Sequence, residues 1–347
     1  MRAKLRTCCS FFIPILILLS IHSLSTLTIA SEEYTRTATA NTSGEVEEFR
    51  LIGPTNLGGS VTLQVGDEDA CNVDLECWAR ARNRRMAEEF TELAEMHLDA
   101  ENGVVTLRLV TPRDAPWEGK DYGIRANLDI YVPPDIVVEI KTRYFDMEIS
   151  GPFKTVDIRN SYGEVQVVDV TEETTIDGSY SKVEVESVQG NLEIETSYNP
   201  IWIRDVDTKE GKALLKTTYG KIDVENLIGT LDASTVYNPI HCSGLTLLGG
   251  QNHIRTVYSK IDLEIDRMED CGLSVTNSYG NINLTVPEDL SAHLRLSVGR
   301  GGTINTNRIL IRPLVLDKTR LEGICGDGDS KIGLQVNGIG KILLEGR

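Results

Sequence analysis

A tyrosine that recurs at a regular spacing constrains the fold of this chain more than any other feature. Each of these tyrosines opens a similar segment, as in Tyr162-Gly-Glu-Val-Gln-Val and Tyr219-Gly-Lys-Ile-Asp-Val. The successive spacings are 18, 18, 18, 21, 18, 21 and 21 residues. The tyrosines that share this position are Tyr144, Tyr162, Tyr180, Tyr198, Tyr219, Tyr237, Tyr258 and Tyr279. A sustained period of this length indicates a repeat architecture.

Apolar residues keep a fixed phase relative to the tyrosine. Around Tyr162, Val156 and Ile158 precede it, Val165 and Val167 follow it, and each alternates with a polar residue. Alternation with a period of two predicts a strand with one buried face. Each repeat is therefore expected to hold two short strands, joined by a turn at the tyrosine, where Gly, Ser or Asn usually follows.

A repeat of this size cannot bury its own apolar face, but stacked repeats can. The sequence therefore predicts an all-β fold: a single β-solenoid with coils of about 18–21 residues. The tyrosines are expected to stack as an aromatic ladder along one corner. An antiparallel sandwich is the alternative, but hairpins would not hold the tyrosine in one phase through seven intervals.

The first 30 residues are typical of an export signal. Arg2, Lys4 and Arg6 precede an apolar run at 11–19, and Ala30 ends a plausible cleavage site. This pattern predicts that the segment is removed and that the protein works outside the cytoplasm, in the periplasm, at the cell surface or as a secreted protein. An uncleaved N-terminal anchor is the alternative, because the apolar stretch is just long enough to span a bilayer.

The rest of the chain divides into three predicted regions. Residues 31–56 are polar and are expected to form a flexible lead-in. Residues 57–135 are expected to form an N-terminal cap of strands with one short helix at 84–98, and residues 136–347 the solenoid repeats. The helix is expected to cover apolar edges at the open end of the stack.

Charge excludes some classes of partner. The chain has 52 acidic and 35 basic residues, a formal net charge of −17. A phosphate-binding surface needs the opposite sign, so nucleic acid and anionic lipid are not expected as partners.

Cysteine and histidine give no support for a metal or cofactor site. Beyond residue 30 the chain has five cysteines, of which Cys71 and Cys77 are the only close pair. A disulfide between them would need a turn, because an extended strand would hold them too far apart. No zinc-type spacing, nucleophile elbow, Walker loop or HExxH motif occurs. The sequence therefore predicts a non-enzyme without cofactors.

Outward-facing residues are the candidate site residues. Trp202 and His241 stand four residues after a tyrosine, where an aromatic ring could stack on a sugar. The alternative is that they only separate like charges along the sheet. Asp177 and Glu195 stand three residues before a tyrosine and are expected to be neighbours about 5 Å apart. Such a pair could serve a glycosidase or bind calcium, but a solvated charge ladder is the simpler interpretation.

The repeat resembles the bacterial putative-adhesin family, an exported β-solenoid domain of unknown function. The resemblance rests on the Ser-Tyr-Gly units at 161–167 and 278–284, the SVTLQV strand at 60–65, the charged helical insertion and Val-Pro-Pro at 132–134. It covers about residues 50–347. It implies a role in the cell envelope or at its surface and supplies no catalytic residues.

Three functions remain open on this basis. A binding scaffold that adheres to a surface protein or glycan is the leading hypothesis. The alternative is an envelope-stress or assembly factor that docks a membrane protein. A polysaccharide-degrading enzyme is the third hypothesis. The oligomeric state is not indicated.

Overall fold

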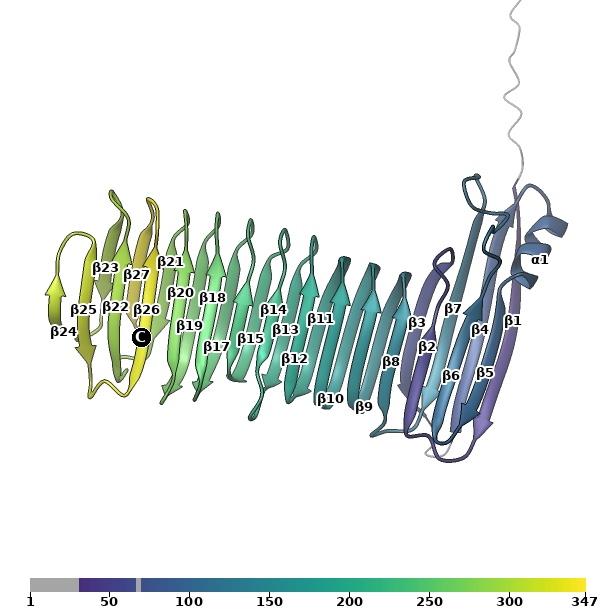
Figure 1. The fold of residues 1–347 in the computed structure, drawn as a ribbon, viewed down its shortest axis with the longest axis horizontal. Helices are drawn as coiled ribbons and strands as arrows, with labels where there is room; N and C mark the ends of the chain where they lie inside the picture. Colours follow the sequence, from purple (N-terminus) through teal and green to yellow (C-terminus); the bar gives the residue numbers. More distant parts are fainter. Residues whose placement is uncertain (1–30, 67–69) are drawn as a thin grey trace, which may run out of the picture. The chain divides into compact units, whose positions relative to one another are not determined.

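The computed structural model of this protein describes residues 31–66 and 70–347. Residues 31–347 form one compact unit, and the predicted export signal lies outside the described residues. Within this unit the strands stack side by side as successive coils, so the predicted all-β solenoid is confirmed (Figure 1). The helical part of the described chain is too short to cross a bilayer.

Each coil contributes one strand to each of two faces, on opposite sides of a shared interior. In stack order, the first face contains β5 (Glu95–Glu101), β6 (Val104–Val110), β2 (Glu48–Ile52), β8 (Val137–Thr142), the second halves of β9 (Tyr144–Asn160) and β10 (Tyr162–Gly178), β12 (Asn191–Thr196), β14 (Ala213–Lys216), β16 (Leu231–Ser234), β18 (Gln251–Thr256), β20 (Gly272–Asn277), β26 (Ser330–Val336), β22 (Ala292–Val298), β25 (Arg320–Cys325) and β24 (Arg312–Leu316).

The second face has the same stack order. It contains β1 (Glu32–Ser43), β4 (Ala70–Ala81), β7 (Gly123–Val132), β3 (Gly58–Val65), the first halves of β9 and β10, β11 (Tyr180–Gln189), β13 (Ile201–Asp207), β15 (Ile222–Gly229), β17 (Ile240–Leu248), β19 (Ile261–Glu269), β21 (Ile282–Val286), β27 (Lys341–Gly346) and β23 (Thr303–Asn307).

The register between coils follows the repeat in the sequence. Tyr162 is opposite Tyr180, and Val165 is opposite Val183, in parallel pairing. Inward side chains therefore lie above their equivalents from coil to coil, and Val183 and Ile201 are fully buried. Burial of this kind contributes about 1.5–3 kcal/mol for each aliphatic side chain, which is why the coils stack.

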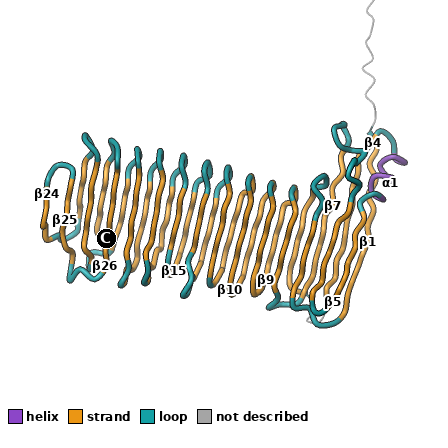
Figure 2. Tube along the Cα trace, viewed as in Figure 1, coloured by secondary structure: helices purple, strands orange, loops and turns teal. Residues whose placement is uncertain are grey.

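Buried polar side chains fix the turn at five of the eight tyrosines. There an Asn or Thr two positions before the tyrosine donates to the carbonyl of the residue that follows the tyrosine of the previous coil. Asn160 Nδ2 donates to Phe145 O over 2.7 Å, Thr235 Oγ1 to Gly220 O over 2.9 Å. These bonds satisfy carbonyls that would otherwise be buried without a partner. Figure 2 shows the turns gathered along the two edges of the stack.

The opposite edge contains the length variation. Seven residues after the tyrosine, shorter and longer repeats alike have a residue with positive φ, such as Asp169 (63°), Ser187 (57°) and Asp205 (53°). The longer repeats differ in the loops at 208–212, 249–250 and 270–271, which hold the additional residues. Extra residues at this edge leave the strand register intact.

The predicted flexible lead-in at 31–56 is wrong. β1 pairs with β4 along 12 residues, and Phe49 and Leu51 of β2 are buried in the core. Alternating Thr and Ala in β1 suit a pleated strand, although their low hydrophobicity makes the segment look disordered. The predicted boundary at 136 also does not mark the start of the solenoid, since β2 and β3 insert as a coil between β6 and β7 on one side and β8 and β9 on the other.

The N-terminal helix is present but shorter than predicted. Helix α1 (Arg84–Glu92) begins at the N-cap Asn83, whose side chain accepts from the Met86 backbone N–H. The predicted range extends to Leu98, but residues 95–101 alternate in polarity and form β5 against β6. Helix α1 packs on β1 and β4 around Phe90, in a cluster separate from the main core.

The C-terminal end also departs from chain order. The final coil, β26 and β27, lies between the coil of β20 and β21 and that of β22 and β23. Beyond β22 come two antiparallel strands, β25 and then β24. The sequence-last residues are therefore inside the stack, and β24 forms its outer edge.

All five described cysteines are buried and free. Cys71 and Cys77 lie on the same extended strand, β4, so no turn brings them together. Their environment is apolar, and burial raises the pKa of the Cys71 thiol to about 12 and that of Cys77 to about 11. These cysteines act as small core residues.

Candidate functional site

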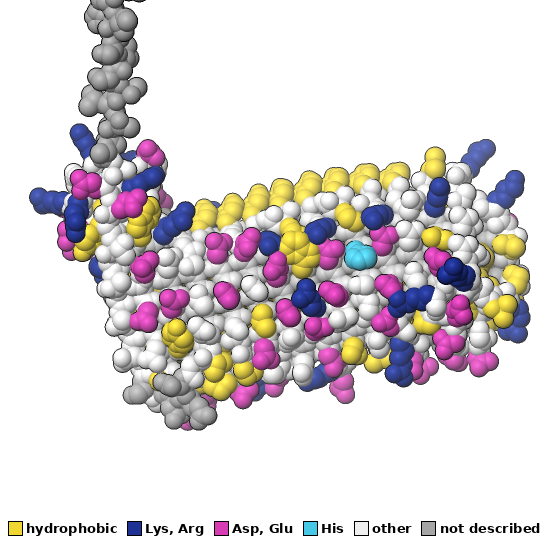
Figure 3. Space-filling view, turned by 180° about the vertical axis from the view of Figure 1, so that it is seen from behind, with side chains coloured by type: hydrophobic (Ala, Val, Ile, Leu, Met, Phe, Trp, Pro, Cys, Tyr) yellow, Lys and Arg dark blue, Asp and Glu magenta, His cyan; other side chains and the backbone are white. Residues whose placement is uncertain are grey.

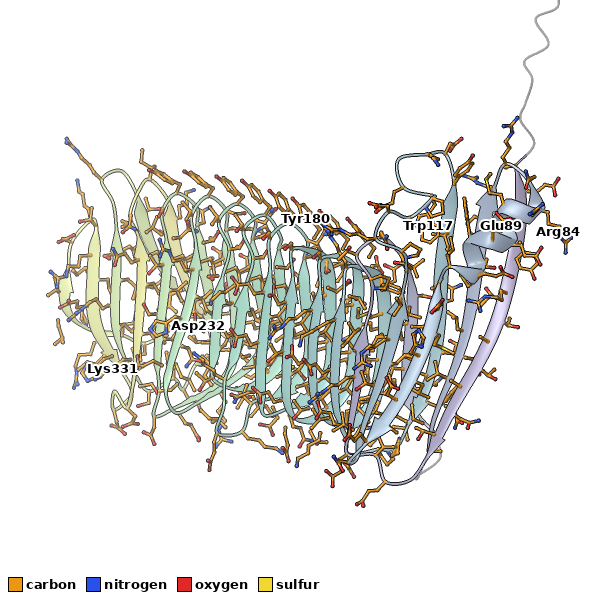
Figure 4. All side chains as sticks on the ribbon, turned by 45° about the vertical axis from the view of Figure 1, so that its right-hand side comes forward. Arg84, Glu89, Trp117, Tyr180, Asp232 and Lys331 are labelled. Carbon is orange, nitrogen blue, oxygen red and sulfur yellow. The ribbon has the colours of Figure 1, made fainter. Side chains whose placement is uncertain are left out.

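The eight repeat tyrosines form one continuous exposed ladder. Neighbouring ring centroids are 4.5–5.4 Å apart, with planes 3–17° from parallel. The guanidinium of Arg143 lies 5.2 Å from the Tyr144 ring centroid and covers the first ring. Figure 3 shows the ladder as a row along one edge, and Figure 4 labels Tyr180 within it. The rings therefore lie in one row along a corner of the stack.

The fixed register brings the outward residues of face two into rows across the coils. Glu184 of β11 is opposite Trp202 of β13, which is opposite Asp223 of β15. Asp223 is in turn opposite His241 of β17. Trp202 and His241, two coils apart, therefore belong to one row and line one open groove of about 420 Å³. That volume falls within the range of small-ligand sites, about 300–1,000 Å³.

Contacts from both neighbouring coils hold the Trp202 ring. The ammonium groups of Lys182 and Lys221 each lie over the ring, 4.7 Å from its centroid. The indole Nε1 donates to Asp223 Oδ2 over 2.6 Å. Trp202 is therefore a positioned aromatic ring, with one lysine ammonium from each neighbouring coil over its π system.

The charges around the ring are paired. Lys182 lies 2.9 Å from Glu184, and Lys221 lies 2.8 Å from Asp223. The hydrogen bond with Glu184 raises the pKa of Lys182, so this ammonium remains charged at neutral pH. Arg204, two residues beyond the tryptophan, lies 3.3 Å from Glu225 and 3.9 Å from Glu186. The groove therefore presents many hydrogen-bonding groups, and its four carboxylates pair with three basic groups, Arg204 and the two lysines.

The His241 end of the row repeats this arrangement. Asp262 is opposite His241 and bonds Lys260 and Asn283. Burial works to raise the pKa of Asp262, but the hydrogen bonds from Lys260 and Asn283 and the nearby His241 hold it below its usual value. Asp262 is thus an ionised acceptor beside the histidine.

A double repeat of 39 residues underlies the groove. Pro200 and Trp202 recur as Pro239 and His241, 39 residues later. The coils between and beside them carry Lys and an acid at the same two positions, as Lys182/Glu184, Lys221/Asp223 and Lys260/Asp262. Proline has a short side chain, so the ring is flanked by lysines of the neighbouring coils and not of its own. The sequence analysis did not predict that lysines flank the ring, although this double period indicates it.

The predicted acidic pair lies on the other face. Asp177 and Glu195 are register partners, in the order Arg159, Asp177, Glu195 and Lys216 across four coils. They are therefore adjacent, as expected, and their flanking neighbours are basic. They do not line the groove around Trp202.

Known proteins place the chain by family. The sequence matches the family described as Toastrack DUF4097 over residues 58–302. No curated protein matches it.

The solved structures that this chain matches share little sequence with it. A putative adhesin from Bacteroides fragilis is 10% identical with a TM-score of 0.35, over 89% of this chain and 97% of that one. A putative adhesin from Parabacteroides distasonis is 10% identical with a TM-score of 0.28, over 89% and 97%. A putative cell adhesion protein from Clostridium sporogenes is 9% identical with a TM-score of 0.22, over 90% and 100%. Likeness at this level carries no argument about the ligand of this chain.

Proposed function

Because this chain belongs to the Toastrack DUF4097 family, whose match covers most of the stacked coils, we propose that it is a non-enzymatic binding scaffold of the cell envelope or surface. The ligand that the groove around Trp202 suits best is a neutral glycan. The observation that carries this proposal is a positioned indole ring in an open groove, surrounded by paired hydrogen-bonding groups.

The chemistry of the groove fits a sugar better than a charged ligand. The C–H face of a pyranose can pack on an aromatic ring, while its hydroxyls need both donors and acceptors. Asp223 and Glu225 offer acceptors, and Arg204 offers donors. Each of these charges already has a partner, so the groove, as lined by the residues that the structure describes, has no free cation to attract an anionic polymer. The surrounding surface has an excess of carboxylates, which would repel such a polymer.

Binding requires the lysines above the ring to move. The Lys182 and Lys221 side chains are 29% and 44% exposed, and each has a carboxylate within 3 Å to which it can remain paired. A sugar ring would replace an ammonium over the indole, and the lysine would swing toward its acid. Affinity is therefore expected to be modest at a single groove.

Titration with neutral oligosaccharides, followed by calorimetry, tests the proposal. Trp202→Ala is expected to weaken binding about tenfold, since loss of an aromatic contact of about 1.4 kcal/mol has that effect. Trp78→Ala is the matched control. Trp78 is also a half-buried outward tryptophan bonded to a carboxylate, Glu33, but it lies on β4 away from the groove.

Equal weakening by both variants, or saturable binding unaffected by Trp202→Ala, would contradict the groove as the site. Non-enzymatic action is tested separately at the acidic pair. Incubation of polysaccharides with the chain and with Asp177→Asn should give no hydrolysis that depends on Asp177. Cleavage that is lost in this variant would instead indicate a glycosidase.

A further inference from the structure

The C-terminal end of the stack finishes in a strand that no other described element covers. β24 pairs with β25 alone, and all five of its residues are exposed. In the segment that leads into it, Ile309 and Ile311 pack against the core, whereas Leu310 is 89% exposed. Leu314 and Leu316 are 64% and 70% exposed. Exposed apolar groups that gather in one region of a protein surface often mark an interaction site.

This end is basic although the chain as a whole is acidic. Residues 300–320 contain five Arg and Lys and one Asp, whereas residues 31–299 contain 24 basic and 47 acidic residues. The ion pairs at this end join Arg295 and Arg320 to Glu322. Among the described residues, Arg308, Arg312 and Lys318 have no carboxylate partner within 4.0 Å. Figure 3 shows basic and apolar side chains together at this end.

The leucines and the unpaired cations occupy one short segment. Arg308, Leu310, Arg312, Leu314, Leu316 and Lys318 lie within residues 308–318 at the end of the stack, and we call them the tip surface. A bulge between Pro313 and Val315 shifts the register of β24 against β25, so these residues share this end of the stack and not one face of the strand. All six are exposed. A surface that combines leucines with unpaired basic groups matches the boundary of a membrane, where acyl chains lie beneath phosphate headgroups.

We propose that the tip surface docks this protein onto a lipid bilayer with anionic headgroups. The leucines would enter the boundary between headgroups and acyl chains, and Arg308, Arg312 and Lys318 would contact the phosphates. The negative net charge of the whole chain would oppose binding to anionic lipid if the charge were spread evenly. Here residues 300–320 have an excess of basic groups at one end, so that end can bind anionic headgroups.

A second copy of this chain is a poorer occupant for two reasons. Two tip surfaces that face each other would bring their unpaired cations together, which like-charge repulsion opposes. Strand-to-strand pairing at the free edge of β24 is also hindered, because Pro313 lacks a backbone N–H. Neither obstacle applies to a fluid, negatively charged bilayer.

Vesicle flotation tests the proposal. Residues 31–347 hold the whole described core as one compact unit, so the chain can begin at Ser31 after circular dichroism has verified a cooperative β fold. The probes are vesicles of phosphatidylcholine alone and of phosphatidylcholine with phosphatidylglycerol. Binding is expected only to the second kind, and added salt should weaken it.

Two tip variants separate the apolar from the charged contribution. Leu310→Ser with Leu314→Ser and Leu316→Ser, and Arg308→Gln with Arg312→Gln and Lys318→Gln, should each weaken binding at least about tenfold. The matched controls lie elsewhere on the stack. Ile228→Ser with Leu248→Ser removes exposed apolar groups, and Lys209→Gln with Lys212→Gln removes exposed cations; both should bind as the parent does.

Absence of flotation with the anionic vesicles overturns the proposal, as does equal loss in the control variants. Sedimentation without lipid measures whether the chain forms oligomers. If the parent is an oligomer and the leucine variant is a monomer, a second copy of the chain occupies the tip surface, and the membrane proposal is overturned. Trp202→Ala should leave vesicle binding unchanged, so the outcome here does not depend on the glycan groove. The flotation measurements on the two tip variants should then be repeated in the full chain.

Discussion

Each repeat tyrosine combines two properties that rarely occur together, exposure to water and close stacking. Tyr198 is 48% exposed, yet its ring lies 4.5 Å from that of Tyr180 and 5.0 Å from that of Tyr219. Tyr279 ends the ladder, has one ring neighbour at 5.4 Å and is 62% exposed. The stability that a tyrosine contributes should therefore depend on its place in the ladder.

We expect Tyr198→Ala to lower the free energy of unfolding by about 1–3 kcal/mol and Tyr279→Ala by about half as much. The reason is that an aromatic pair contributes about 0.5–1.5 kcal/mol, and Tyr198 loses two pairs where Tyr279 loses one. Urea unfolding followed by circular dichroism measures both. A larger loss at Tyr279 than at Tyr198 would show that stacking is not what stabilises the corner.

The buried cysteines give a second test at the scale of single residues. Burial raises the pKa of the thiols of Cys71, Cys77, Cys242, Cys271 and Cys325. At about pH 8.5 a free cysteine is half ionised, whereas these buried thiols form little of the reactive thiolate. In a chain that begins at Ser31, a thiol reagent should label none of them at this pH before denaturation and all five afterwards. Labelling of the native protein, or fewer than five thiols after unfolding, would contradict the buried, reduced state.

At the scale of elements, helix α1 and the coils belong to separate packing units. Phe90 contacts Trp117 and Tyr122, with ring centroids 5.6 and 5.5 Å apart, in a small cluster that does not include the main core. Trp117 is labelled beside the helix in Figure 4. The N-terminal edge of the stack is thus protected by antiparallel strands with the helix packed on them.

Phe90→Ala should therefore loosen the N-terminal cluster and leave the coils intact. A buried Phe replaced by Ala typically costs about 3–5 kcal/mol, and here the loss is expected within one local cooperative unit. Hydrogen exchange read by mass spectrometry should show faster exchange in α1, β1 and the loop at 111–122, and unchanged protection from β10 onward. Faster exchange throughout the coils would mean that the cluster and the core unfold together.

Residues 31–347 are close to a one-dimensional stack, because each coil contacts mainly its neighbours. Residues of one coil pair with the equivalent positions of the next, and the same rows continue from β9 to β21. The length of the stack is therefore set by the number of coils and not by any one contact.

Deletion of residues 180–218 should give a shorter protein that still folds. It removes 39 residues, two whole coils, and joins Ser179 to Tyr219 in the correct phase. Small-angle scattering should show a stack shorter by about 10 Å, since each coil adds about 4.8 Å. Deletion of residues 180–209, which is not a whole number of coils, should abolish cooperative folding; equal stability of the two deletions would contradict the register.

Much of this architecture follows from the sequence by itself, because the information is local and periodic. The phase of the tyrosines and the alternation of Val165 and Val167 with polar residues both predict the strands of a coil and the contacts of that coil with its neighbours. A buried face that recurs every 18–21 residues has only one economical arrangement, with each coil on the next. The row that joins Trp202 to His241 follows from the same phase.

Tertiary structure alone decided the features that depend on which strand edges remain free. Three such features are the insertion of β2 and β3 between later coils, the pairing of β1 with β4, and the position of the final coil inside the stack. Each of them pairs segments that lie far apart in the chain, where no local period specifies a partner. The cover of the Trp202 ring by Lys182 and Lys221 likewise needs three coils at a fixed spacing. Pattern determines which face of a strand is buried, whereas three-dimensional packing determines which strands and side chains meet.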